Sequence, residues 1–264
     1  MSETSDAVGA LVEDAVRRGV RGKDVAVAFS GGLDSGLVAA LAGRHAAKAT
    51  LYTVGSDVAY DVRMAKNMLP DLGLEWNHVP LTEDAVELAI REMVRVTGTV
   101  NPLTVSFELP LFCVCRACME DMVIGGQGSD EIFAGYSKYV GLDDGSLRKA
   151  MAEDLAKLRG PVMTHEAKTA GHFKKTVLYP FLDDGLLSYL QSLDVRMLRP
   201  VSEESRKNLL REAATSLGFG FVADRKKKAA QYGSGTMDLV RKICRGRGVT
   251  FTELVEAISH EEAV

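Results

Sequence analysis

Apolar positions along the first half of the chain alternate between two spacings. A helical spacing over residues 8–16 predicts an opening amphipathic helix that Gly19 and Gly22 end. A short apolar run predicts a buried strand at residues 25–29, and further strands are predicted at residues 50–54, 76–79 and 122–125. Helices are predicted between these strands, at residues 37–47, 61–69, 82–96 and 110–119. Pro70 is expected to end the second of these helices, and Pro110 to begin the fourth.

Strands that are apolar almost throughout and alternate with helices are typical of a parallel sheet covered on both faces. We therefore predict an α/β fold, a doubly wound and mostly parallel sheet. After Tyr139 the strand signals fade, and helical patterns follow at residues 147–158, 202–217, 236–246 and 252–260. This change from alternating strands and helices to helices alone predicts an α/β core over residues 1–142. A C-terminal helical portion over residues 143–264 is expected to complete the active site.

Composition narrows the class of protein. The chain has 264 residues, of which 46% are hydrophobic and 26% charged, as in an ordinary globular domain. A net charge of −4 gives no global basic field, which disfavours nucleic acid as the partner. No apolar run approaches the roughly 20 residues of a membrane helix, and residues 1–6 are too polar for a signal peptide. We expect a cytoplasmic protein with no membrane partner, and leave a homo-oligomer open.

Residues 25–41 read VAVAFSGGLDSGLVAAL, an apolar run that ends in glycines, an aspartate and a serine before a helix begins. In an open parallel sheet, ligands bind beyond the carboxyl ends of strands, and the N–H groups of a helix N-terminus attract anions. Gly31 and Gly32 let the backbone approach a ligand, and Ser30 and Ser35 add hydroxyl donors. Asp34 would repel a phosphate unless a cation lay between them, and Mg²⁺ binds through carboxylates and substrate phosphates together.

The stretch lacks the Gly-Lys-Ser/Thr of a Walker loop and does not fit the dinucleotide G-x-G-x-x-G pattern. It resembles the SGGxDS pyrophosphate loop of the ATP pyrophosphatase (PP-loop) superfamily, whose members split ATP between its α and β phosphates. The resemblance implies an adenine nucleotide alpha hydrolase-like fold and ATP as the nucleotide. It also implies that the pyrophosphate is held by Ser30, Gly31, Gly32, Asp34 and Ser35.

A second glycine-rich stretch, VIGGQGSDEIFAGYSKY over residues 123–139, again follows a strand. Asp130 offers a second carboxylate, and the two strand ends could meet at one edge of the sheet, so that Asp34 and Asp130 would share Mg²⁺. The stretch resembles the G-E-G-S-D-E-x-F-G-G-Y segment of asparagine synthetases. YPFLDDGLL from Tyr179 resembles the P-F-L-D segment of that family, and RKKKAAQYGSG from Arg225 resembles its R-x-K segment.

The resemblance implies a reaction and a set of roles. A substrate carboxylate attacks the α-phosphate of ATP, pyrophosphate leaves, and ammonia or an amine converts the acyl-adenylate into an amide and AMP. Lys227 fits the family lysine that contacts the phosphates and the reaction centre, and the adjacent Lys228 stays an alternative. The position of Gln127 is the family's candidate base. The positions that border the adenosine are Phe29, Val54, Gly125 and Gly126.

Three departures separate this sequence from the family pattern. Ser2 follows Met1 and the first motif begins by Ser30, so we expect no N-terminal glutaminase domain, and ammonia, another amine or a separate ammonia-supplying subunit as the nitrogen source. Gln127 replaces a glutamate, and a glutamine amide can orient an amine but cannot accept its proton. Thr176 and Leu178 replace acidic and basic residues before P-F-L-D, so the carboxylate need not be aspartate.

Two other functions stay open at this point. Some PP-loop enzymes that adenylate a tRNA base for thiolation hold an iron–sulfur cluster, and Cys115, Cys118 and Cys244 could supply such a set. We prefer a core role for these residues and for Cys113, because the second motif does not match those enzymes and free cysteine is commonly buried. The other alternative is an ATP-binding partner subunit that performs no chemistry.

Overall fold

The structure is a computed structural model that describes residues 2–224 and 230–262. Its centre is a five-stranded sheet of order β3-β2-β1-β4-β5, in which every pair of neighbours is parallel. The strands are β1 (Asp24–Ala28), β2 (Lys48–Gly55), β3 (Glu75–Pro80), β4 (Met122–Ile124) and β5 (Thr176–Leu178). Val25 pairs with Ala49 of β2 on one side and with Met122 of β4 on the other. β1 is therefore the central strand, and its carboxyl end lies between those of β2 and β4.

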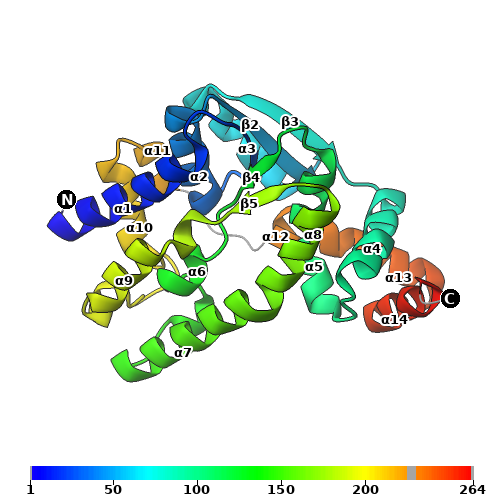
Figure 1. Cartoon of the computed structure of the whole chain (residues 1–264). Helices are drawn as coiled ribbons and strands as arrows, with labels where there is room; N and C mark the ends of the chain where they lie inside the picture. Colours follow the sequence, from blue (N-terminus) through cyan, green and yellow to red (C-terminus); the bar gives the residue numbers. More distant parts are fainter. Residues whose placement is uncertain (1, 225–229, 263–264) are drawn as a thin grey trace.

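Helices cover both faces of the sheet (Figure 1). One face packs against α1 (Glu3–Val20), α2 (Leu33–His45), α3 (Tyr60–Leu72), α9 (Asp184–Ser192), α10 (Asn208–Ser216) and α11 (Gly220–Ala223). The other packs against α4 (Glu83–Thr97), α5 (Pro102–Ala117), α13 (Thr236–Arg247) and α14 (Phe251–Glu262). The side chains of β1 show the two faces, since Val25 and Val27 belong to the first apolar cluster and Ala26 to the second. The predicted doubly wound parallel sheet is confirmed.

Four further α-helices lie within the described residues. They are α6 (Ser129–Ile132), α7 (Asp144–Lys157), α8 (Met163–His172) and α12 (Ala230–Gly233). A π-helical turn, Leu158–Val162, joins α7 to α8, so that these two helices follow one another almost without interruption. α8 packs against α4, α5 and β5. The segment after residue 143 thus reaches back to the sheet.

Three expectations about local structure were wrong. β5 lies in the second half of the chain, where no strand was predicted, and it pairs with β4 at an edge of the sheet. Pro70 lies inside α3, which continues to Leu72 and ends where Gly73 adopts a left-handed conformation. Pro110 lies inside α5, because that helix begins about two turns earlier at a cap in which Asn101 Oδ1 accepts hydrogen bonds from the N–H groups of Leu103 and Thr104.

Within the described residues, no single helix is both long and apolar enough to cross a bilayer, and the α4–α5 pair meets the criterion only jointly, across a 104° bend.

Candidate active site

A large cavity opens at the carboxyl ends of β1, β2 and β4. Its volume is about 1370 Å³. Both glycine-rich motifs line it, as do side chains from α5, the α7–α8 segment and α10. Of the positions predicted from the sequence, the cavity walls contain Phe29, Ser30, Gly32, Asp34, Ser35, Val54, Gly125, Gly126, Gln127 and Asp130. The topology therefore brings together two motifs that lie about 90 residues apart in the chain.

The first motif forms a tight turn from β1 into α2. Ser30 N donates to Ser35 Oγ at 3.2 Å, and the hydroxyls of Ser30 and Ser35 lie 3.1 Å apart. Gly32 is the N-cap of α2 and makes no side-chain cap bond, so the first N–H groups of the helix face the cavity without a capping side chain. Such a helix N-terminus is suited to an anion such as a phosphate group.

Gly31 is buried beneath the turn and does not line the cavity. Its φ is +72°, and a Cβ at this position would lie 2.4 Å from the backbone N of Ala65 in α3. The glycine is therefore required because α3 passes directly behind the turn. Gly32 differs, since a Cβ there would meet only Ser30 Oγ, at 3.5 Å.

Gly31→Ala is expected to destabilise the fold by about 2–3 kcal/mol, because it adds left-handed strain to a clash with backbone that cannot move aside. Urea unfolding of the purified variant measures the change. Gly32→Ala is the matched control and should change the free energy of unfolding by less than about 1 kcal/mol. Equal losses in the two variants would contradict the role assigned to the α3 contact.

The second motif touches the first. A Cβ on Gly126 would lie 2.9 Å from Asp34 Cβ and 3.1 Å from Ser35 N, so only glycine allows the two turns to approach this closely. Gly128 adopts a φ of +93° and is the N-cap of α6, the short helix that carries Asp130. The predicted proximity of Asp34 and Asp130 is thereby realised on two adjacent turns.

Lys207 lies between these two carboxylates. Its Nζ is 2.7 Å from Asp34 Oδ2 and 2.7 Å from Asp130 Oδ1, and it donates to Ser129 Oγ at 2.6 Å. The residue is only 3% exposed. Burial alone would lower the pKa of Lys207, but the neighbouring Asp130 and Asp34 outweigh it and raise the pKa. The ammonium is therefore charged.

The path of the Lys207 side chain depends on unusual backbone. Lys207 has a φ of +58° just before α10. A Cβ on Gly135 would lie 2.2 Å from Lys207 Cε and 2.0 Å from Asp130 Oδ1. Strain of this kind tends to occur at functional sites. Lys207 was not predicted from the sequence, although it directly precedes α10, a helix with the buried residues Leu210 and Ala214.

The carboxylates also fit the magnesium ion that was predicted for them. Asp34 Oδ1 is buried and has no hydrogen-bond partner among the described residues. Asp130 lies across the same small space, and carboxylate oxygens are ligands that Mg²⁺ prefers. No group of three or more acidic, histidine or cysteine side chains suited to a metal occurs within residues 2–224 and 230–262, so substrate phosphates would have to complete the coordination.

A buried carboxylate, Glu166, stands beside Gln127. Gln127 Nε2 donates to Glu166 Oε1 at 3.1 Å, and the hydroxyl of Tyr179 donates to Glu166 Oε2. Glu166 is 3% exposed and lines the cavity. Burial raises the pKa of Glu166 to about 7, a hydrogen bond from Tyr179 lowers it in part, and the nearby Glu131 raises it further. Gln127 stands where the family pattern has a glutamate, and the carboxylate of Glu166, on α8, lies next to it.

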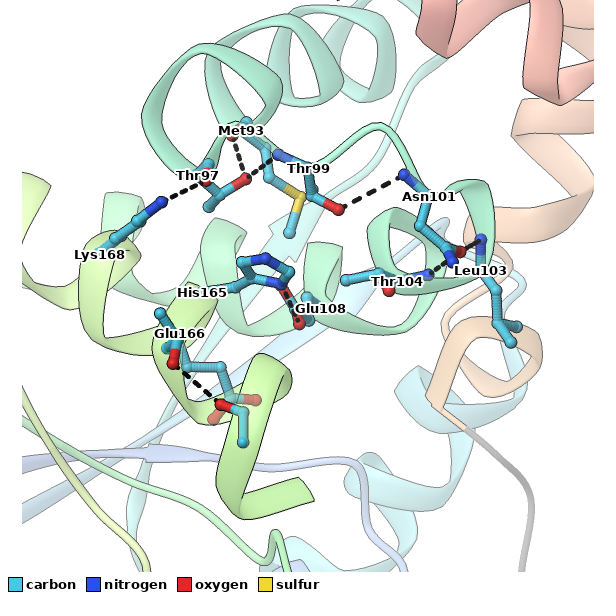
Figure 2. A network of polar contacts seen from close by, with 12 residues as sticks. Met93, Thr97, Thr99, Asn101, Leu103, Thr104, Glu108, His165, Glu166 and Lys168 are labelled. Atoms are coloured by element: carbon cyan, nitrogen blue, oxygen red, sulfur yellow. Dashed lines mark hydrogen bonds and ion pairs between the residues drawn. The ribbon is translucent and has the colours of Figure 1, made fainter. Parts of the chain in front are cut away.

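A second buried acid lies behind Glu166. Figure 2 shows Glu108 of α5 meeting His165 of α8 between the two helices, with Glu166 as the next residue of α8. His165 Nδ1 is 3.4 Å from Glu108 Oε1, while Glu108 Oε2 has no partner among the described residues. Burial and the nearby Glu166 raise the pKa of Glu108 to about 9, so this carboxyl is neutral at pH 7. Neutral Glu108 can lie beside Glu166 without like-charge repulsion.

Two predicted lysines, Lys227 and Lys228, lie outside the described residues. Thr176 and Leu178 belong to β5, and neither lines the cavity. Leu178 instead packs beside Gly19 of α1.

All four cysteines are free and buried in the apolar cluster that contains α4, α5, α13 and α14. Burial raises the pKa of the Cys113 and Cys115 thiols to about 12, which disfavours the thiolate that a metal cluster requires. The arrangement favours the core interpretation of the cysteines.

Comparison with known proteins agrees with the motifs. A family model for asparagine synthase matches residues 7–143, just over half of the chain. A Methanocaldococcus jannaschii protein named for glutamine-hydrolyzing asparagine synthetase is 25% identical over 93% of this chain and 52% of its own length. A carboxyethyl-arginine beta-lactam-synthase of Streptomyces clavuligerus is 27% identical over 97% of this chain and 49% of its own length. The chain thus spans about half the length of these curated relatives.

Among solved structures, an NMN synthetase from Francisella tularensis covers 98% of this chain, with 90% of its own chain aligned, 15% identity and a TM-score of 0.45.

Proposed function

The chain belongs to the asparagine synthase family, and from its cavity we propose that it is an ATP- and Mg²⁺-dependent ligase that forms AMP and pyrophosphate. It would adenylate a substrate carboxylate and make an amide with ammonia or an amine. The observation that carries the proposal is the meeting of three features in one cavity: the SGGLDS turn, the second glycine turn and the buried carboxylate of Glu166.

In the first step, a carboxylate oxygen attacks the α-phosphorus of ATP and the bond to the β-phosphate oxygen breaks. The N–H groups at the start of α2, which have no capping side chain, and the hydroxyls of Ser30 and Ser35 would bind the departing pyrophosphate. Lys207, which contacts Asp34 of that turn, would supply a further positive charge. Asp34 and Asp130 would hold Mg²⁺, which neutralises phosphate charge when it is bound. Phe29, Val54, Gly125 and Gly126 would border the adenosine, and Lys227 or Lys228 would add a phosphate contact.

In the second step, the amine nitrogen attacks the carbonyl carbon of the acyl-adenylate, the bond to the phosphate oxygen breaks, and AMP leaves. The nitrogen must lose a proton, and we assign its acceptor as Glu166, in the place of the missing glutamate. Gln127 would orient the amine through its amide group, and Tyr179 would orient Glu166.

A substrate panel tests the proposed function. The protein is incubated with ATP, Mg²⁺, ammonium and a set of carboxylates, and pyrophosphate release is measured. Release that depends on a carboxylate is the expected result. Release that depends only on tRNA would replace the proposal with base adenylation for thiolation. ATP binding without turnover under every condition would instead identify an ATP-binding subunit that performs no chemistry.

Glu166→Gln is expected to slow amide formation by about 10²–10⁴-fold while ATP–pyrophosphate exchange with the carboxylate continues. A base must be unprotonated, so wild-type amide formation should rise as pH increases through about 7, the value to which burial raises the pKa of Glu166. The variant should lose this acidic limb. Rates of amide formation from pH 5.5 to 8.5, compared at equal concentrations of unprotonated amine, provide the measurement.

Glu203→Gln is the matched control, because Glu203 also lines the cavity but its side chain is 51% exposed. The same acidic limb in wild type and Glu166→Gln would remove Glu166 from the role of base.

A further inference from the structure

The cavity is larger than one ligand requires. Its volume of about 1370 Å³ exceeds the roughly 300–1,000 Å³ of a typical small-molecule pocket. The glycine turns, the start of α2 and Lys207 occupy the part nearest the sheet. The remainder extends between α5 and the α7–α8 segment, and its walls are the ones that an acyl substrate would meet.

The wall formed by α5 is apolar. Its cavity-lining residues follow the i, i+4, i+7, i+8, i+11 spacing of a single helical stripe: Leu103, Phe107, Pro110, Leu111 and Val114. Leu103 is 66% exposed although it is a large aliphatic side chain on the cavity wall. Apolar side chains left open on a concave surface are characteristic of ligand sites.

The α7–α8 segment supplies a second apolar wall that leads to Glu166. Leu158, Val162 and Glu166 line the cavity at successive spacings of four residues, through the π-helical turn that joins the helices. We call the space bounded by Leu103, Phe107, Leu158 and Val162 the acyl lobe. Glu166 is one helical turn beyond Val162, so a substrate that fills the lobe would present its reactive end near the candidate base.

The charges around the lobe disfavour a second carboxylate on the substrate. Among the described lining residues, the basic side chains are already engaged. The contacts are Lys138 and Lys157 with Asp154, Arg206 with Glu203, Lys207 with Asp34 and Asp130, and Arg211 with the carbonyl of Ala223. The acids Glu131 and Glu166 also line this cavity. A second carboxylate on the substrate would bring its negative charge next to these acids.

We propose that the substrate is a monocarboxylate whose acyl group is apolar, a medium-length aliphatic or aryl-alkyl chain that fills the acyl lobe. The inference rests on the proposed function and specifies its substrate class. An apolar acyl group removes the exposed faces of Leu103, Phe107 and Val162 from water, and it needs no counter-ion in the lobe.

Carboxylate-dependent ATP–pyrophosphate exchange tests the inference. The panel contains acetate, hexanoate, octanoate, 3-phenylpropionate, aspartate and glutamate, each at several concentrations with full-length protein. We expect kcat/KM for hexanoate, octanoate or 3-phenylpropionate to exceed that for aspartate by at least about 100-fold. Faster exchange with aspartate or glutamate would overturn the inference and leave the ligase intact. Exchange with no carboxylate would overturn the ligase proposal and the inference together.

Two variants locate the preference in the lobe. Val162→Asp places a charge on the wall and should lower kcat/KM for octanoate by about 10- to 100-fold while acetate changes little. Phe107→Ala keeps the lobe uncharged and should raise KM for octanoate about 10-fold. Val201→Asp is the control, since Val201 is 78% exposed and does not line the cavity. Wild-type kinetics for octanoate in both lobe variants would overturn the assignment of the lobe.

Discussion

Lys207→Met is expected to lower the free energy of unfolding by about 3 kcal/mol in the absence of Mg²⁺. The methionine keeps most of the volume of the lysine but removes the ammonium that lies 2.7 Å from both Asp34 and Asp130. Two neighbouring carboxylates then face one another without a counter-charge. Removal of one partner from a buried ion pair costs about 3–5 kcal/mol, and the lower end applies because about a quarter of each aspartate side chain stays exposed.

Urea unfolding of the variant with and without Mg²⁺ measures this effect. If Asp34 and Asp130 form a cation site, Mg²⁺ should stabilise Lys207→Met more than it stabilises wild type, because the two carboxylates then have no other counter-charge. Lys149→Met is the matched control, since the side chain of Lys149 is 80% exposed and contacts only Glu153 among the described ion pairs. Unchanged stability in Lys207→Met would show that the two carboxylates do not need a cation.

The strands and helices could be predicted where the local sequence of an element has the apolar pattern of its structure. Three of the five strands, β1, β2 and β4, lie in short apolar runs, and parallel strands necessarily bring their carboxyl ends to one edge, which places the two glycine motifs together. β5 was not predictable in this way. It has three residues, Thr176–Leu178, none of them fully buried, and it becomes a strand only because it pairs with β4. A strand this short at the edge of a sheet does not need an apolar or alternating sequence pattern.

Some residues of the candidate site could likewise be predicted from the sequence, and others could not. Residues within the motifs, such as Ser30, Asp34 and Asp130, could be placed from the sequence because the turns that carry them follow predicted strands. Lys207 and Glu166 could not, because Lys207 precedes α10 and Glu166 lies in α8, and the positions of these helices depend on tertiary packing. A polar residue on a buried helix face was the available signal, and it does not indicate which cavity the residue enters.

Asp34 belongs both to the first glycine-rich motif and to the ion pairs around Lys207. It follows the glycines at the start of α2, it contacts Lys207, and its Oδ1 is buried without a partner among the described residues. The free oxygen is the reason to expect that Asp34 acts on the nucleotide as well as on the fold.

Asp34→Asn is therefore expected to reduce carboxylate-dependent pyrophosphate release by at least about 10³-fold while the protein stays folded. The asparagine has the same shape and can still accept a hydrogen bond from Lys207, whose charge remains paired with Asp130. The loss of activity is measured as pyrophosphate release across a Mg²⁺ titration. Thermal unfolding checks that the variant stays folded. Asp184→Asn is the control, since the Asp184 side chain is 97% exposed and outside the cavity. Near-normal release in Asp34→Asn would refute the magnesium assignment and leave Asp34 a structural partner of Lys207.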